Sequence, residues 1–101
     1  MTKTETPTTN SEYNGWANHS TWNVSLWISN DENLCNAACK AVDTLKHRGT
    51  LDATITPEWA KAFCRVEFAS AFKNEQTPDG IGINDPNIDW SAIADMIKEL
   101  A

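Results

Sequence analysis

Cys35 and Cys39 are the two residues whose type and spacing come nearest to a metal-binding pattern. They lie four positions apart, so on a helix their thiols would share one face. Cys64 and His47 are the further candidate ligands, but a structural zinc site needs four ligands and usually takes them as closely spaced pairs across a loop. No such pairs occur here, and buried cysteines commonly pack as small apolar side chains. We therefore expect core packing for the cysteines, no metal ion and no organic cofactor.

Two other patterns could indicate an active site. His19 is adjacent to Ser20, and Gly80-Ile81-Gly82 is a short glycine pair. Adjacency in sequence does not make a catalytic triad, which depends on spatial geometry. The glycine pair lacks the preceding strand, the third glycine and the lysine of a phosphate-binding loop. We therefore expect no enzymatic activity, and a small hydrolase or nucleotide-binding protein is the least favoured interpretation.

Acidic residues dominate the last third of the chain. The whole protein has a net charge of −6, and residues 74–101 contain six acids against the single lysine Lys98. This balance argues against direct binding of nucleic acid, whose phosphates require clustered Lys and Arg. It favours a protein partner with a basic surface, and a protein that handles nucleic acid would present one. The acids expected to contact such a partner are Asp79, Asp85, Asp89, Asp95 and Glu99.

Two aromatic residues form a second candidate contact surface. Tyr13 and Trp16 flank Asn14-Gly15, a pair with strong turn propensity. Aromatic side chains around a turn are good interface anchors. The alternative, which we favour, is that they close one end of the core, because tryptophan is usually well buried.

Start signals and apolar spacing predict a mainly α-helical bundle of about four helices that could position these residues. Asn18, Ser20 or Thr21 can cap the first helix, Asp31 or Asn30 the second, Thr56-Pro57 the third and Asp89 the fourth. Gly49 is a suitable residue to end the second helix. The apolar alternation within residues 22–28 also fits a strand, which stays the alternative there. The predicted helices cover residues 20–29, 32–47, 57–73 and 89–100.

Apolar residues on these helices should form one core. Trp90, Ile93, Ile97 and Leu100 make a narrow seam at heptad spacing, which could also pair with a second copy of the chain. Between the third and fourth helices, residues 74–87 read as a long loop of turn signals, typical of a functional or mobile segment. The predicted core consists of Trp22, Leu26, Leu34, Val42, Leu45, Trp59, Phe63, Val66, Trp90, Ile93 and Ile97.

Length and composition fit a single domain. The 101 residues are 41% hydrophobic and 22% charged, which is ordinary for a soluble protein. Residues 1–12 are rich in threonine and poor in apolar residues, so we expect a disordered tail ahead of a helical domain at 13–101. No apolar run approaches the ~20 residues of a membrane span. Three cysteines and no secretory signal pattern predict a reducing, cytoplasmic compartment.

The segment that begins at Tyr13 has a distinctive signature. It reads Tyr-Asn-Gly-Trp-x-Asn-x-x-Thr-Trp-Asn-Val-x-Leu-Trp-Ile and is followed by Asn30-Asp31-Glu32. This signature resembles one in small uncharacterised proteins of bacteriophages and their bacterial hosts. The resemblance covers about Tyr13 to Cys39 and brings no known activity with it. It implies a setting in the cytoplasm of a bacterial or phage-infected cell.

These observations predict a small, acidic, non-enzymatic interaction protein of phage or mobile-element type. It would bind, and could thereby inhibit, a host or defence protein with a basic surface. The alternative is a structural homo-oligomer, such as a homodimer, that pairs through the C-terminal seam.

Overall fold

The computed structural model describes residues 18–100, and these residues are mainly α-helical. Two predictions lie outside the described residues: the turn flanked by Tyr13 and Trp16, and the disordered tail at residues 1–12. Within the described range the helices are α1 (His19–Asn30), α2 (Glu32–Arg48), α3 (Leu51–Thr54), α4 (Pro57–Phe72) and α5 (Trp90–Lys98). The predicted fold class is confirmed, and the segment 22–28 is helical rather than a strand. The four-residue helix α3 was not predicted, because it is too short to show an apolar period.

The helix boundaries follow from capping side chains. Asn18 accepts a hydrogen bond from the Thr21 N–H at 2.8 Å and so is the residue that caps α1. The predicted caps Asp31, Thr56 and Asp89 each accept a bond from the N–H three residues later. At the end of α2, Gly49 has φ of 73°, a left-handed conformation that glycine adopts without strain. Local sequence therefore sets where most of these helices begin and end.

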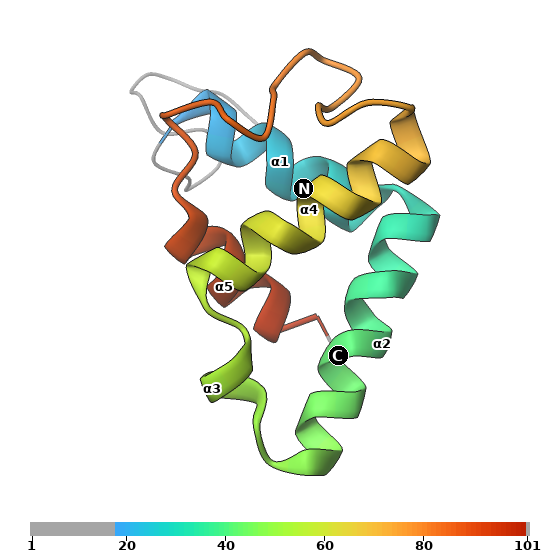
Figure 1. Cartoon of the computed structure of the whole chain (residues 1–101), viewed down its shortest axis with the longest axis vertical. Helices are drawn as coiled ribbons and strands as arrows, with labels where there is room; N and C mark the ends of the chain where they lie inside the picture. The colour runs from blue at the N-terminus through green and yellow to red at the C-terminus, as the bar shows by residue number, and fades with distance from the viewer. Residues whose placement is uncertain (1–17, 101) are drawn as a thin grey trace.

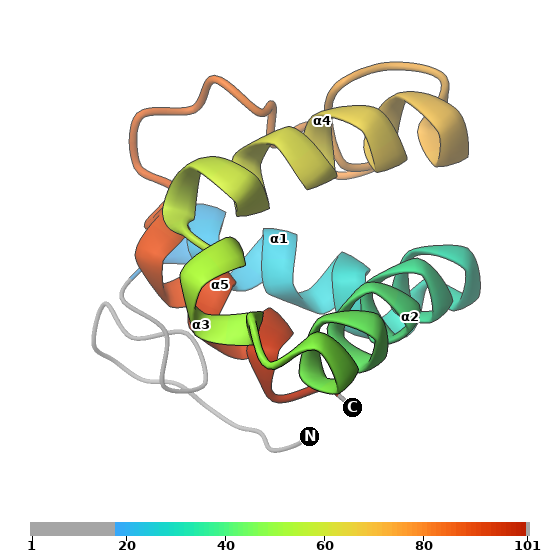
Figure 2. The same cartoon turned by 60° about the horizontal axis from the view of Figure 1, so that its bottom comes forward.

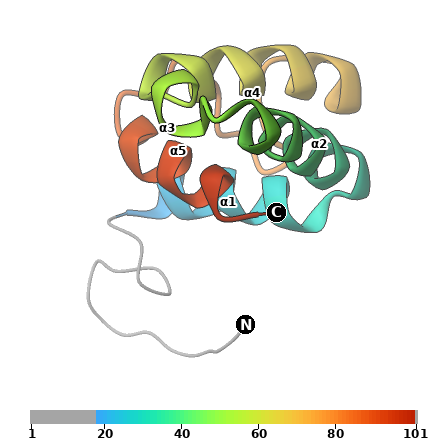
Figure 3. The ribbon, with the colours of Figure 1, turned by 90° about the horizontal axis from the view of Figure 1, so that it is seen from below.

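The helices stack around a central layer. Figure 3 shows α4 along one side of the molecule and α1 along the other, with α2 and α5 between them, and Figure 2 shows α1, α2 and α5 all on the same side of α4. Helices α1 and α2 are joined by Asp31 alone, while α3 connects α2 to α4 (Figure 1). The packed pairs include α4 with α5, α1 with α2, and α1 with α5. None of the helices among residues 18–100 is long and apolar enough to cross a membrane.

The core differs in part from the predicted set. Of that set, Leu34, Val42, Ile93 and Ile97 are fully buried. Leu45, Trp59, Phe63 and Trp90 are partly buried and pack against the core cluster. Fully buried residues that were not predicted include Val24, Ile28, Ile55, Phe68 and Ile83.

Three predicted core residues are wrong. Val66 is 63% exposed, because α4 turns Ala60, Cys64 and Phe68 towards the core. A residue two positions from Cys64 lies about 200° around the helix, on the outer side. Trp22 and Leu26 are only half-buried and lie outside the core cluster, while Val24 and Ile28 occupy the inner face of α1.

The long segment between α4 and α5 is folded back onto the bundle. It contains a tight turn in which the Thr77 N–H donates to the Ile81 carbonyl and the Gly80 N–H donates to the Thr77 carbonyl, both at 2.9 Å. Gly80 has φ of 95°, which a residue with a side chain rarely adopts. Ile83 and Ile88 from this segment are buried in the core. The predicted loop thus exists, and its apolar residues anchor it.

Candidate partner-binding site

The first half of the loop is held against α1 by a polar network. Asp79 accepts hydrogen bonds from Asn23 Nδ2 at 2.8 Å and from Trp27 Nε1 at 3.0 Å. Asn23 Oδ1 in turn accepts from the Thr77 hydroxyl at 2.7 Å, and that hydroxyl accepts from the Ile81 N–H at 3.1 Å. The bond from Asn23, followed by the one from Trp27, lowers the pKa of Asp79. This predicted contact residue therefore also fixes the loop in place.

The second half of the loop is held by the start of α1. Asp85 accepts a hydrogen bond from the Ser20 hydroxyl at 2.9 Å. The Asn87 carbonyl accepts from Asn18 Nδ2 at 2.8 Å, and the Asp89 N–H donates to Thr21 Oγ1 at 2.9 Å. Ser20, which adjoins His19 in sequence, thus supports the loop through Asp85. Helix α1 and its cap Asn18 therefore hold the acidic loop through their polar side chains, while the apolar side chains of α1 pack into the core.

The remaining predicted contact acids lie on or beside α5. Asp89 caps that helix and is exposed. Asp95 is paired with Lys98 at 3.3 Å, and Lys98 also approaches Asp52 at 3.7 Å. Glu99 is exposed just beyond the end of the helix. The structure therefore brings the five acids onto the loop and α5, while Tyr13 and Trp16 lie outside the described residues.

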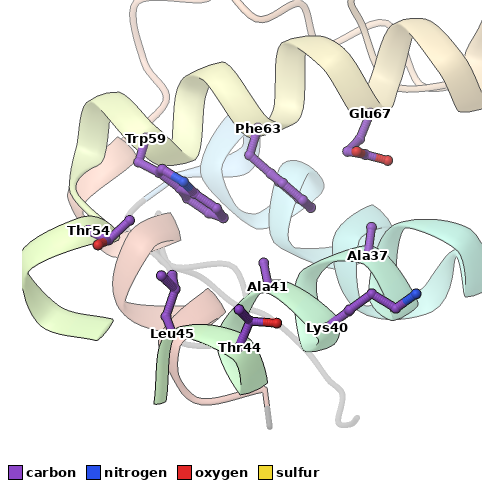
Figure 4. Close-up of a pocket in the computed structure, with 9 residues that line it drawn as sticks. All are labelled: Ala37, Lys40, Ala41, Thr44, Leu45, Thr54, Trp59, Phe63 and Glu67. Atoms are coloured by element: carbon purple, nitrogen blue, oxygen red, sulfur yellow. The ribbon is translucent and has the colours of Figure 1, made fainter. Parts of the chain in front are cut away.

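A groove between α2 and α4 is a concave feature that sequence reasoning missed. It has a volume of about 480 Å³. Figure 4 shows Trp59, Phe63 and Glu67 extending from α4 towards the facing residues of α2. The lining residues are Ala37, Lys40, Ala41, Thr44, Leu45, Thr54, Trp59, Phe63 and Glu67.

The groove has an apolar wall and a polar end. The rings of Trp59 and Phe63 are stacked, with centroids 5.2 Å apart and planes inclined by 11°. The side chains of Ala37 and Ala41 opposite are short, so they leave the space open. Lys40 on α2 and Glu67 on α4 line the same end of the groove, away from Trp59 (Figure 4). Such a groove can accept apolar side chains, with one charge of each sign available at its end.

Sequence reasoning missed the groove because it assigned Trp59 and Phe63 to a closed core. The available signal was the wide apolar arc of α4, which includes a second stripe beside Ala60, Cys64 and Phe68. A helix with so wide an apolar arc needs neighbouring elements on two sides to cover it. Among residues 18–100, the structure places α5 on one side of α4, and α2 with the short α3 near the other.

The cysteines are distributed between core and surface. Cys64 is buried as expected, and burial raises the pKa of its thiol. Cys35 and Cys39 are only half-buried, so the expectation of core packing is wrong for them in part. Burial and the neighbouring Cys35 raise the pKa of Cys39. Among residues 18–100, no three His, Cys, Asp or Glu side chains are gathered as a metal site.

Comparison with known proteins places the chain in a family. The model of a family of unknown function, DUF7249, matches residues 9–101, so the chain belongs to that family. The match extends far beyond the signature segment Tyr13 to Cys39 and includes the loop and α5. Searches of curated proteins and of solved structures gave no significant match.

Proposed function

We propose that this DUF7249 protein acts by binding another protein and is not an enzyme. The observation that carries the proposal is the groove between α2 and α4, with its stacked Trp59 and Phe63. Aromatic side chains that line a concave surface are typical anchors of protein interfaces. The occupant would be an apolar segment of the partner, with a polar or charged group beside Lys40 and Glu67.

Charge supports a partner with a basic surface. The protein has a net charge of −6, and Asp79, Asp89, Asp95 and Glu99 are all exposed. Because hydrogen bonds to α1 hold the loop, its carboxylates need little further ordering on binding. Complementary charge of this kind raises the rate of encounter and selects among partners. The resemblance to phage proteins suggests a host or defence protein in the bacterial cytoplasm, which binding could inhibit.

The alternative of a homo-oligomer has lost its main support. It depended on the seam of Trp90, Ile93, Ile97 and Leu100, but Ile93 and Ile97 are 0% exposed in the core of a single chain. Trp90 and Leu100 also pack against that core. The seam is therefore used within the molecule.

A pull-down from bacterial lysate with matched variants tests the proposal. Ala41→Glu places a carboxylate in the groove, whereas Ala62→Glu adds the same charge at an exposed site of α4 outside the groove. We expect Ala41→Glu to lose the partner and Ala62→Glu to retain it. Circular dichroism should first show that both variants keep the helical fold.

Salt then separates the contribution of charge. Raising the salt from 0.15 M to 1 M shortens the Debye length from about 8 Å to about 3 Å, so a charge-steered complex should form more slowly and bind more weakly. Equal retention of the partner by Ala41→Glu and Ala62→Glu would reject the groove as the binding site. A complex indifferent to salt would reject the role of the acids. Failure to find any specific partner would count against the interaction function itself.

A further inference from the structure

The half-buried thiols of α2 form a pair that the proposed protein-binding function does not use. Cys35 and Cys39 are one helical turn apart, and their Sγ atoms are 4.0 Å from each other. Cys39 Sγ also lies 3.5 Å from the carbonyl oxygen of Leu100, which follows α5. Neither cysteine lines the groove between α2 and α4. The half-buried pair therefore lies on a part of α2 that does not line the candidate binding site.

Helix geometry opposes a disulfide at this position. Residues four apart on a helix have Cβ atoms about 5–6 Å from each other. A disulfide requires Cβ atoms about 3.5–4.5 Å apart. Closing the bond would therefore require local unwinding in the middle of α2, which runs without interruption from Glu32 to Arg48.

The same geometry suits an atom placed between the two sulfurs. Metal–thiolate bonds are about 2.3 Å long in zinc sites. With bonds of about that length, sulfurs 4.0 Å apart would subtend an angle of about 120° at the metal. A small side-chain rotation would widen this angle towards a linear arrangement.

We propose that Cys35 and Cys39 form a two-thiolate site for a soft, thiophilic cation of the Cu(I) class. Binding converts two thiols and one Cu(I) into a bis-thiolate complex and releases two protons, with no change of oxidation state. Thiolate ligands select Cu(I), whereas a structural zinc ion needs four ligands. The described residues offer no cluster of three or more such groups, so zinc should not bind here stoichiometrically. Any third position on the cation is left for solvent or an external thiol.

Titration of the reduced full-length protein with Cu(I) under anaerobic conditions, in competition with a chromophoric Cu(I) chelator, tests this site. We expect one Cu(I) per chain and a thiolate-to-copper charge-transfer band in the ultraviolet. Cys35→Ser or Cys39→Ser should weaken binding by more than about 100-fold, since even loss of an outer-shell partner costs about 10–100-fold in metal affinity. Cys64→Ser, which removes the buried thiol, is the matched control and should bind as the wild type does.

X-ray absorption of the Cu(I)-loaded wild-type protein gives a readout that needs no variant. We expect two protein sulfur ligands at one short distance and no dependence on protein concentration. The site would be rejected by absence of stoichiometric Cu(I) binding, by loss of binding in Cys64→Ser, or by one sulfur ligand only. Stoichiometric zinc binding through these thiols would also contradict it. None of these outcomes depends on whether the groove binds a partner.

Discussion

Thr77→Val is the sharpest single test of how the acidic loop is held. Thr77 is 1% exposed, and its hydroxyl donates to Asn23 Oδ1 at 2.7 Å while it accepts from the Ile81 N–H at 3.1 Å. Valine has nearly the same shape as threonine but lacks the hydroxyl. The substitution therefore removes two hydrogen bonds without opening a cavity.

The expected cost follows from the groups left behind. Asn23 is 1% exposed, so its Oδ1 atom would be buried without a hydrogen bond, at a cost of about 1–3 kcal/mol. The Ile81 N–H lies in a partly exposed turn and can be hydrated, so its lost bond costs about 1 kcal/mol. We expect Thr77→Val to lower the free energy of unfolding by about 2–4 kcal/mol, a large share of the ~5–15 kcal/mol typical of one domain.

Urea denaturation followed by circular dichroism measures this change. Thr77→Ser is the control, because it keeps the hydroxyl and loses one buried methyl, at a cost of about 1 kcal/mol. A double-mutant cycle with Asn23→Ala should show non-additivity, since the two residues share a hydrogen bond. If Thr77→Val is no more destabilising than Thr77→Ser, the hydroxyl network does not hold the loop and the reasoning is refuted.

Three further predictions concern packing, backbone and pH. Phe68→Ala should lower the free energy of unfolding by about 3–5 kcal/mol. Val66→Ala, at an exposed position, should change it by less than about 0.5 kcal/mol. Similar urea midpoints for the two variants would contradict the burial pattern of α4. Gly49→Ala should lower the free energy of unfolding by about 1 kcal/mol, because φ of 73° disfavours a residue with a Cβ. An unchanged thermal midpoint would contradict the left-handed conformation at the end of α2. The hydrogen bond from Asn23 is the main cause of the lowered pKa of Asp79. The ionised Asp79 carboxylate therefore contributes its full stabilisation above the ordinary pKa of 3.8, and this stabilisation is lost as the pH falls below that value. In acid titrations, the stability difference between wild type and Asp79→Asn should shrink below that pH, and a constant difference would refute the assignment.

Local sequence was sufficient to identify the main helices. Asp31, Thr56 and Asp89 act as caps because a short polar side chain can reach the N–H three residues later without help from distant parts of the chain. The wide apolar content of α4 and the turn residues of the loop were also readable. These signals depend on neighbours within a few residues, which sequence order preserves.

The candidate partner-binding site depends on contacts between residues that are far apart in the sequence. Asp79 was predicted as an acid that contacts a partner, and the structure also places it against Asn23 and Trp27, more than fifty positions earlier in the chain. No local pattern pairs an aspartate with an asparagine at that separation. The role of Asp85 in holding α1 was missed for the same reason.

The sequence by itself determined the helical class, the limits of the main helices, the acidic balance and the existence of a long loop. Tertiary structure alone decided that Val66 faces solvent, that the C-terminal seam packs into the chain's own core, and that Trp59 and Phe63 line a groove. The physical reason is that an apolar stripe predicts only that some neighbour will cover that face of the helix. Which face is covered depends on the neighbouring helices, and within residues 18–100 these leave part of α4 open at the groove.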